Sequence, residues 1–168
     1  MIDINDLLSK AEQADPVSQY NLGVCYYEGK GVTKDFKKAV YWFTKAAEQG
    51  LASAQYNLGV CYYNGEGVTL NFKKAVYWCT KSAEQGIDVA QNNLGAYYEN
   101  GEGVTKDFKK AVYWYTKAAE QGKAVAQNNL GRCYYEGKGV TKDIKKAEYW
   151  YNKSKEQVNA EANAILKM

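Results

Sequence analysis

The side chains that could carry out chemistry are few in this 168-residue chain, and the four cysteines stand out among them. Cys25, Cys61 and Cys133 share one position of a repeated pattern, whereas Cys79 occupies another. The chain contains no histidine, which removes the usual general base near neutral pH and the commonest metal ligand. Catalysis by Ser-His-Asp or Cys-His groups, and zinc sites that use histidine, are therefore excluded.

The spacing of the cysteines favours a structural role. No C-x-x-C or other zinc-binding spacing occurs. Equivalent atoms of adjacent repeats should lie on the order of 10 Å apart, beyond the reach of about 7 Å between the Cα atoms of a disulfide. A bridge between Cys61 and Cys79 within one repeat is the remaining alternative. We expect four reduced cysteines that act as small buried residues in a reducing compartment.

Two other motifs recur at fixed intervals, a G-x-G sequence that begins at Gly29 and a lysine pair that begins at Lys37. A phosphate site would need a complete G-x-G-x-x-G or a P-loop lysine, and neither is present, so G-x-G predicts a turn between helices. The lysine pairs could form a basic stripe for a nucleic-acid backbone. Each repeat also carries a glutamate at one fixed position, whose negative charge offsets part of the lysine charge. This favours a solvated convex face over a nucleic-acid site. The lysine pairs are residues 37–38, 73–74, 109–110 and 145–146.

All of these motifs belong to a unit of 36 residues that occurs four times without gaps. Such a period is typical of stacked supersecondary units, in which neighbours bury each other's apolar faces. Leu58, Gly59 and Tyr62 have helical spacing and predict a first helix that ends near Gly65. Asn71 is the predicted N-cap of a second helix. Small residues near the end of that helix let the next unit pack closely.

The shared pattern is A-x-x-x-L-G-x-x-Y, a G-x-G loop, D-x-x-K-A-x-x-W and A-A-E-Q-G. It resembles the Sel1-like repeat, a longer-looped relative of the tetratricopeptide repeat, over roughly residues 14–157. The resemblance implies an all-α, right-handed α-α superhelical solenoid whose concave face is lined by the first helices. It also implies an adaptor that binds other proteins and performs no chemistry itself.

Some cysteine-rich Sel1-like proteins are secreted, carry paired cysteines in each unit and are described as β-lactamases. This chain departs from that group, because its cysteines are not paired in every unit. None of its five serines begins an S-x-x-K motif, and K-T-G is absent. We therefore expect no enzymatic activity, no catalytic residues, no cofactor and no metal site.

The repeat boundaries predict a single solenoid domain over residues 1–168. An N-terminal capping helix is expected over 1–14 and a C-terminal capping helix over 159–168. Polar replacements near both ends are typical of capping units. The four repeats between the caps are predicted at 15–50, 51–86, 87–122 and 123–158.

Positions that vary between repeats should be those that no neighbouring repeat contacts. By analogy with tetratricopeptide repeats, the concave positions flank Leu-Gly on each first helix. Four tyrosines fall at these positions in repeats 1 and 2, and tyrosine is enriched in binding hot spots. The alternative is that some of these rings only cover helix ends or pack between units. The predicted partner-binding residues are Tyr20, Val24, Tyr27, Glu28, Tyr56, Val60, Tyr63, Asn64, Asn92, Ala96, Glu99, Asn100, Asn128, Arg132, Tyr135 and Glu136.

The sequence thus predicts a scaffold that holds a protein or peptide in its concave groove. In repeat 4 we expect Arg132 to lie beside Glu136, so that the groove runs from aromatic to mixed charge. An immunity protein that neutralises a partner toxin is one alternative, and nucleic-acid binding through the lysine stripe is another. The N-terminus lacks the features of a signal peptide and no apolar stretch is long enough to span a membrane. We expect a cytoplasmic monomer.

Overall fold

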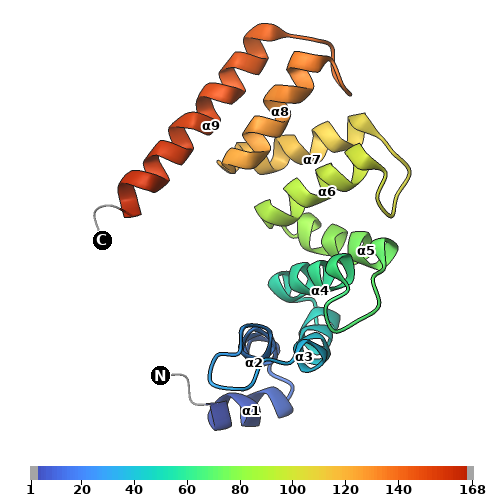
Figure 1. The fold of residues 1–168 in the computed structure, drawn as a ribbon, viewed down its shortest axis with the longest axis vertical. Helices are drawn as coiled ribbons and strands as arrows, with labels where there is room; N and C mark the ends of the chain where they lie inside the picture. Colours follow the sequence, from blue (N-terminus) through green and yellow to red (C-terminus); the bar gives the residue numbers. More distant parts are fainter. Residues whose placement is uncertain (1–3, 166–168) are drawn as a thin grey trace. The chain divides into compact units, whose positions relative to one another are not determined.

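The computed structural model describes residues 4–165, and the side chains of residues 4–159. That part of the chain contains nine α-helices and no strand (Figure 1). The chain divides into two compact units, residues 1–85 and residues 86–168. The helices of unit 1 are α1 (Ile4–Glu12), α2 (Pro16–Glu28), α3 (Phe36–Glu48), α4 (Ala52–Asn64) and α5 (Phe72–Glu84). Those of unit 2 are α6 (Asp88–Asn100), α7 (Phe108–Glu120), α8 (Ala124–Glu136) and α9 (Ile144–Ile165).

The helix ends follow from the residues that the sequence places there. Each first helix stops at a glycine with φ near +75°, as at Gly29 with φ 75° and Gly65 with φ 74°, a conformation that side chains disfavour. Each second helix begins at a side-chain cap. The Asp35 carboxylate accepts the Lys38 backbone N–H at 3.0 Å, and Asn71 does the same for Lys74 at 3.0 Å. The predicted cap at Asn71 is confirmed.

In repeats 2 and 4 the second position of the G-x-G loop requires glycine for both a conformational and a steric reason. Gly67 has φ 72°, and a Cβ atom there would collide with the backbone carbonyl of Phe36 in the preceding repeat. Gly139 stands in the same relation to Phe108 in unit 2. The loop therefore serves as a turn that packs tightly on its neighbour.

In unit 1, successive helices pack on one another from α1 to α5. A central cluster buries Phe43, Leu58 and Cys61 together with alanines of α3 and α4. Gly59 allows α4 to approach α5, because a Cβ there would lie 3.2 Å from the Ala75 carbonyl oxygen.

In unit 2, α6 packs on α7, α7 on α8 and α8 on α9. Its central cluster buries Tyr115, Leu130 and Cys133 with four alanines of α7 and α8. The buried ring of Tyr115 lies over Gly95, where a Cβ atom would come within 2.6 Å of the ring. The all-α class and the four helical repeats that the sequence predicts are confirmed.

Within each unit, a buried glutamine joins a second helix to the first helix that comes after it. Gln55 donates to the Ala47 carbonyl at 3.2 Å, and Gln127 donates to the Ala119 carbonyl at 3.1 Å. Gln19 makes the equivalent bond to the Ala11 carbonyl at 3.0 Å. Helix α1 therefore occupies the place of a second helix in front of repeat 1.

The last helix differs from the sequence expectation. A separate capping helix is predicted over 159–168, whereas residues 159–165 continue α9 without interruption. Val158 replaces the glycine that ends the other second helices, so the helix has no left-handed residue at which to stop. Residues 166–168, which the sequence assigns to the cap, lie outside the described part of the chain.

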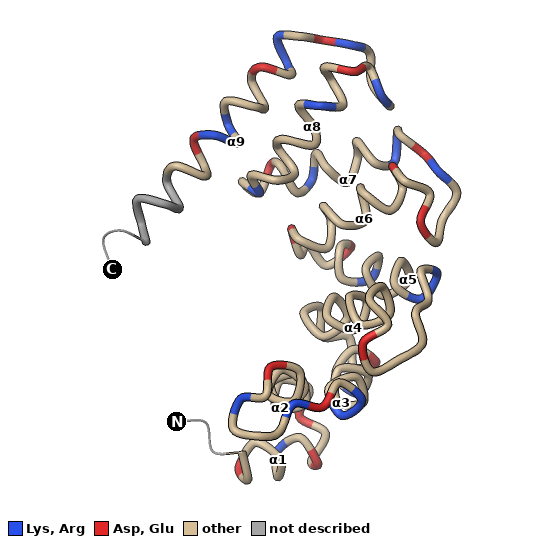
Figure 2. The backbone as a smooth tube through the Cα atoms, viewed as in Figure 1, with Lys and Arg blue, Asp and Glu red and all other residues tan. Residues whose placement is uncertain are grey.

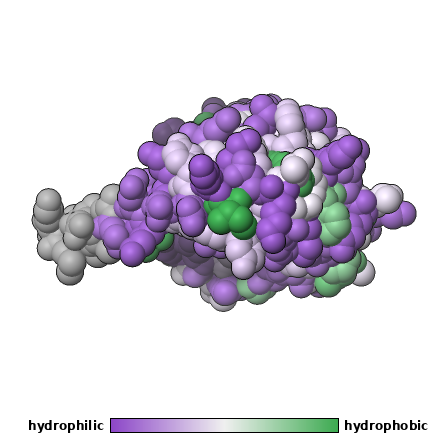
Figure 3. Space-filling model, turned by 90° about the horizontal axis from the view of Figure 1, so that it is seen from above, coloured by the Kyte–Doolittle hydropathy of each residue, from purple (hydrophilic) through white to green (hydrophobic). Residues whose placement is uncertain are grey.

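Charge and hydropathy are distributed unevenly over the helices. Figure 2 shows that α4 carries no charged residue, whereas α3 and α5 begin with lysines. The face drawn in Figure 3 is mainly hydrophilic, with small and separate hydrophobic patches. Within residues 4–165, none of the helices combines the length and apolar character of a membrane span.

Candidate interaction surface

A pocket of about 250 Å³ opens between the first helices of repeats 1 and 2 in unit 1. Six of its lining residues are among the predicted partner-binding residues. The pocket is lined by Tyr20, Val24, Tyr27, Glu28, Phe43, Tyr56, Asn57 and Val60. The pocket thus brings together three of the four tyrosines that sequence reasoning grouped in repeats 1 and 2, namely Tyr20, Tyr27 and Tyr56.

Phe43 forms the base of this pocket, although it belongs to a second helix. Its ring reaches past Gly23, where a Cβ atom would lie 2.6 Å from the ring carbons. The ring is buried, and its centroid lies 5.9 Å from that of Tyr20 and 6.3 Å from that of Tyr27. The glycine therefore provides the space that lets a core ring contact the pocket tyrosines.

One wall of the pocket is fixed by a hydrogen bond between repeats. The Tyr27 hydroxyl donates to the Glu66 carboxylate at 2.7 Å. Burial, and next this hydrogen bond, raise the pKa of Tyr27 well above its usual value, so its ring stays neutral at physiological pH. Asn64 donates to the same carboxylate at 3.2 Å. Tyr63 packs against Phe72 with the ring centroids 5.3 Å apart.

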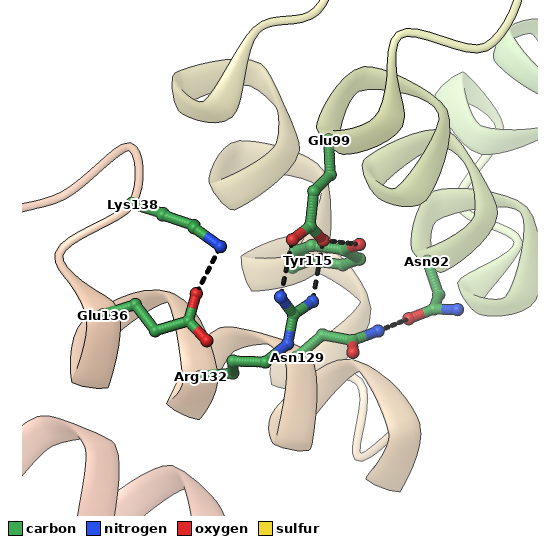
Figure 4. A network of polar contacts seen from close by, with 7 residues as sticks. All are labelled: Asn92, Glu99, Tyr115, Asn129, Arg132, Glu136 and Lys138. Carbon is green, nitrogen blue, oxygen red and sulfur yellow. Dashed lines mark hydrogen bonds and ion pairs between the residues drawn. The ribbon is translucent and has the colours of Figure 1, made fainter.

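The equivalent positions of unit 2 hold a polar network (Figure 4). Glu99 takes the place of Tyr27, and Arg132 takes the place of Val60. The Arg132 guanidinium donates to both oxygens of the Glu99 carboxylate, at 2.6 and 2.8 Å. The hydroxyl of Tyr115, the equivalent of Phe43, donates to Glu99 at 2.8 Å. These polar groups satisfy one another.

The electrostatics of this network follow from its hydrogen bonds. The hydrogen bond from Arg132 is the largest influence on Glu99 and holds its pKa below the usual value, against the opposing effect of burial. The Glu99 side chain is only 12% exposed. Burial, and next the bond to Glu99, raise the pKa of Tyr115. The network therefore contains a carboxylate that stays charged while largely shielded from water.

The sequence expectation for this region did not include the ion-pair partner of Arg132. Arg132 lies on the same helix as Glu136, but it pairs with Glu99 on α6. Glu136 instead forms an ion pair with Lys138 at 2.6 Å. Helical spacing predicts neighbours within one helix, but it carries no information about the partner that a facing helix offers.

The remaining predicted site residues of unit 2 lie apart from the network or at its edge. The side-chain amide of Asn129 donates to Asn92 at 3.0 Å, as Figure 4 shows. Asn100 is exposed and donates weakly to Glu102 at 3.4 Å. Tyr135 is exposed under the ammonium group of Lys142, 5.5 Å from the ring centroid. Ala96 is half-buried and Asn128 is exposed.

The lysine pairs are divided between two roles. The second lysine of each pair lies over a tyrosine of the first helix, as Lys38 does over Tyr26 at 5.2 Å and Lys74 over Tyr62 at 5.0 Å. Such cation–π contacts stabilise helix packing. All eight lysines of these pairs are exposed, so the cation–π contacts do not remove their charge from the surface.

Sequence reasoning missed Phe43 and its equivalents Cys79, Tyr115 and Tyr151. This position varies between the repeats, and that variation was the available signal. It comes directly after the invariant tryptophan, and in three repeats an aromatic ring there lies over the Leu-Gly glycine of the first helix. The position could be assigned to the site only once the two helices were seen to cross at that glycine.

All four cysteines are buried, and none of them forms a disulfide with another. Burial raises the pKa of the Cys61 and Cys79 thiols to about 12, and that of Cys133 to about 11. A thiol with such a pKa is a poor nucleophile at neutral pH. Among the described residues, no group of His, Cys, Asp and Glu side chains could hold a metal ion.

Comparison with known proteins identifies the repeat. Four consecutive segments match the family model of the Sel1 repeat, at residues 16–51, 52–87, 88–123 and 124–159. These boundaries lie one residue later than those that the sequence alone suggests. A search of curated proteins finds no match.

Solved structures with similar folds come from several bacteria. A protective antigen of uropathogenic Escherichia coli strains, which displays an SLR fold, is 43% identical over 94% of this chain with a TM-score of 0.91. A Sel1 repeat protein from Oxalobacter formigenes is 38% identical over 92% of the chain with a TM-score of 0.87. The chain covers 34% and 63% of these two structures. Helicobacter pylori cysteine-rich protein B is 30% identical over 79% of this chain and 95% of its own, with a TM-score of 0.59.

Proposed function

The chain belongs to the Sel1 repeat family, and we propose that it is a non-enzymatic scaffold that binds a protein or peptide through the first helices of its repeats. Sel1 repeat proteins generally mediate protein–protein interaction. The observation that supports a specific surface is the pocket of unit 1, which gathers Tyr20, Tyr27 and Tyr56 around the buried ring of Phe43. We place the binding hot spot there.

The chemistry of this pocket fits one large apolar side chain of a partner. Its volume of about 250 Å³ exceeds the roughly 150 Å³ of an engineered cavity that binds benzene, so an aromatic or branched aliphatic side chain can enter. Tyrosine walls give a large contact area and lose little entropy on binding. Glu28 at the rim is half of an exposed ion pair with Lys30 at 2.6 Å, so the rim is polar around an apolar interior.

Unit 2 contributes differently to the proposed surface. At its equivalent positions the Glu99–Arg132 pair presents polar groups that are already paired. A partner that extends over this unit would therefore gain little from an apolar anchor there. We accordingly assign the main anchor to repeats 1 and 2 and secondary polar contacts to repeats 3 and 4.

A peptide selection tests this proposal even while the natural partner is unidentified. Peptides selected from a displayed library on the immobilised protein are titrated by calorimetry against wild type and against Tyr20→Ala combined with Tyr56→Ala. We expect at least tenfold weaker binding of the double variant, because truncation of a hot-spot tyrosine costs about 2 kcal/mol or more. Both tyrosines are only half-buried, so the unfolding midpoint should change little.

The control uses the basic face of the same unit. Lys37→Glu combined with Lys73→Glu reverses two exposed lysines that lie over no tyrosine ring. We expect this variant to bind the selected peptides as wild type does. If it abolishes binding while the tyrosine variant binds normally, the proposed surface is wrong and the lysine face takes its place.

A further inference from the structure

A second kind of pocket lies on the side of the second helices and occurs in both units. It is bounded by a glutamate, an edge-to-face tyrosine–tryptophan pair and a lysine. In unit 1 these residues are Glu48, Tyr77, Trp78 and Lys81. In unit 2 they are Glu120, Tyr149, Trp150 and Lys153. The pocket measures about 350 Å³ in unit 1 and about 530 Å³ in unit 2.

In unit 1 an amide group of the chain itself satisfies the acceptors of this pocket. The side-chain nitrogen of Gln85 donates to the Gln55 amide oxygen at 2.7 Å and to the Gly50 carbonyl at 3.0 Å. Gln85 can do so because α5 ends at Glu84, which leaves Gln85 as the C-cap residue. In repeat 3, Gln121 makes the same two bonds to Gln91 and Gly86, at 2.8 and 3.0 Å.

Repeat 4 lacks this arrangement. Helix α9 continues to Ile165, so the equivalent Gln157 remains within the helix, in the wall of the pocket. Gln127 is buried, since only 4% of it is exposed, and its nitrogen donates to the Ala119 carbonyl. Its amide oxygen accepts no hydrogen bond from the described residues. A buried acceptor without a donor is costly, which makes this oxygen a point where a bound group would be stabilised.

The charges around the pocket define the kind of donor that fits. Two carboxylates, those of Glu120 and Glu156, and one ammonium group, that of Lys153, line the pocket. The ammonium group lies 4.0 Å from Glu156 and 5.9 Å from the centre of the Tyr149 ring. Aromatic walls beside an excess of negative charge favour a cation. A guanidinium is planar, stacks on aromatic rings and donates in several directions at once.

We propose that the pocket of repeat 4 binds an arginine side chain of a protein or peptide partner. The guanidinium stacks on the Tyr149–Trp150 pair, donates to the Gln127 amide oxygen as Gln85 does to Gln55, and forms an ion pair with Glu120. The site is separate from the apolar pocket of unit 1, and it does not depend on the function proposed for that pocket.

The test uses the blocked peptide acetyl-Gly-Arg-Gly-amide and the ¹H–¹⁵N signals of the tryptophan indoles. We expect the Trp150 signal to shift with saturation while the Trp78 signal stays in place, because Gln85 already occupies the equivalent site. Replacing arginine by citrulline removes the charge and should weaken binding about tenfold or more. Equal shifts at Trp78 and Trp150, or equal affinity for the citrulline peptide, would overturn the proposal.

Matched variants locate the site on the chain. Glu120→Gln combined with Glu156→Gln should weaken binding of the arginine peptide about tenfold, whereas Glu48→Gln combined with Glu84→Gln should leave it unchanged. All four glutamates are exposed, so both variants are expected to fold, which their urea unfolding midpoints check. Unchanged binding by the first variant contradicts the proposal. Tighter binding of free arginine than of the peptide would assign a small-molecule site and contradict a protein partner.

Discussion

The two units use the same positions of their repeats for opposite purposes. Tyr27 and Val60 in unit 1 help to form an open apolar pocket, whereas Glu99 and Arg132, two repeats later, join in a polar network. The base residue changes accordingly from Phe43 to Tyr115, whose hydroxyl supplies the extra donor. A position that stacking leaves free to vary can thus either line an open pocket or complete the packing of its own unit.

The two units share the same framework beneath these positions. In both units an aromatic ring lies over the Leu-Gly glycine of a first helix, with Phe43 over Gly23 and Tyr115 over Gly95. The backbone geometry at the base of the site is therefore similar. The difference between the units comes from side chains on top of that base.

The largest expected effect comes from substituting the glycines that lie beneath these aromatic rings. Gly95→Ala places a Cβ atom 2.6 Å from the buried Tyr115 ring, and we expect a loss of about 1–3 kcal/mol in the free energy of unfolding. Gly23→Ala should cost a similar amount against Phe43. Urea denaturation followed by circular dichroism measures both.

Repeat 2 supplies the control for this prediction, because Cys79 replaces the aromatic ring. A Cβ atom at Gly59 would lie 3.2 Å from its nearest neighbour, so Gly59→Ala should cost less than either of the other substitutions. An equal loss at all three glycines would show that the ring is not the reason for the glycine.

A smaller effect is expected from the charge of the unit 2 network. Glu99→Gln leaves Arg132 without its carboxylate partner. Breaking a fully buried ion pair costs roughly 3–5 kcal/mol. Because the Arg132 side chain is 34% exposed, we expect a smaller loss of about 1–2 kcal/mol in the free energy of unfolding at pH 7. The equivalent substitution in unit 1, Tyr27→Phe, removes only a neutral donor and should cost about 1 kcal/mol.

The pH dependence of stability sharpens this prediction. The pKa of Glu99 is lowered from its ordinary value of 4.5 by the bond from Arg132. Its contribution is therefore fully present above pH 4.5 and is lost as the pH falls through the lowered pKa. The difference in unfolding free energy between wild type and Glu99→Gln should therefore shrink as the pH falls from 4.5 through the lowered pKa of Glu99. A difference that stays constant down to low pH contradicts the assigned role of the carboxylate.

Much of the fold could be predicted from the repeat alone. The period of 36 residues predicts the order of the helices. The positions of glycine and of Asp or Asn predict most helix ends, because N-caps and left-handed C-terminal residues depend only on the local sequence. The end of α9 could not be predicted in the same way. Val158 stands where the other repeats have glycine, so the local stop signal is missing and the helix runs on to Ile165.

The candidate site could be predicted only in part. The first-helix positions of unit 1 were found because they vary while the packing positions do not. Phe43 was missed because it lies on another helix. The ion-pair partner of Arg132 could not be foreseen either, because Glu99 is 33 residues away. Contacts between helices of different repeats carry the information that a linear pattern lacks.

An exchange of three residues tests most directly whether the apolar pocket of unit 1 is the main anchor for a partner. Tyr27→Glu, Phe43→Tyr and Val60→Arg together give unit 1 the residues that form the network in unit 2. Affinity of the selected peptides is measured by calorimetry for this variant and for wild type. We predict at least a tenfold loss of affinity in a protein that keeps its helical circular dichroism spectrum. Unchanged affinity in the folded variant would contradict the account.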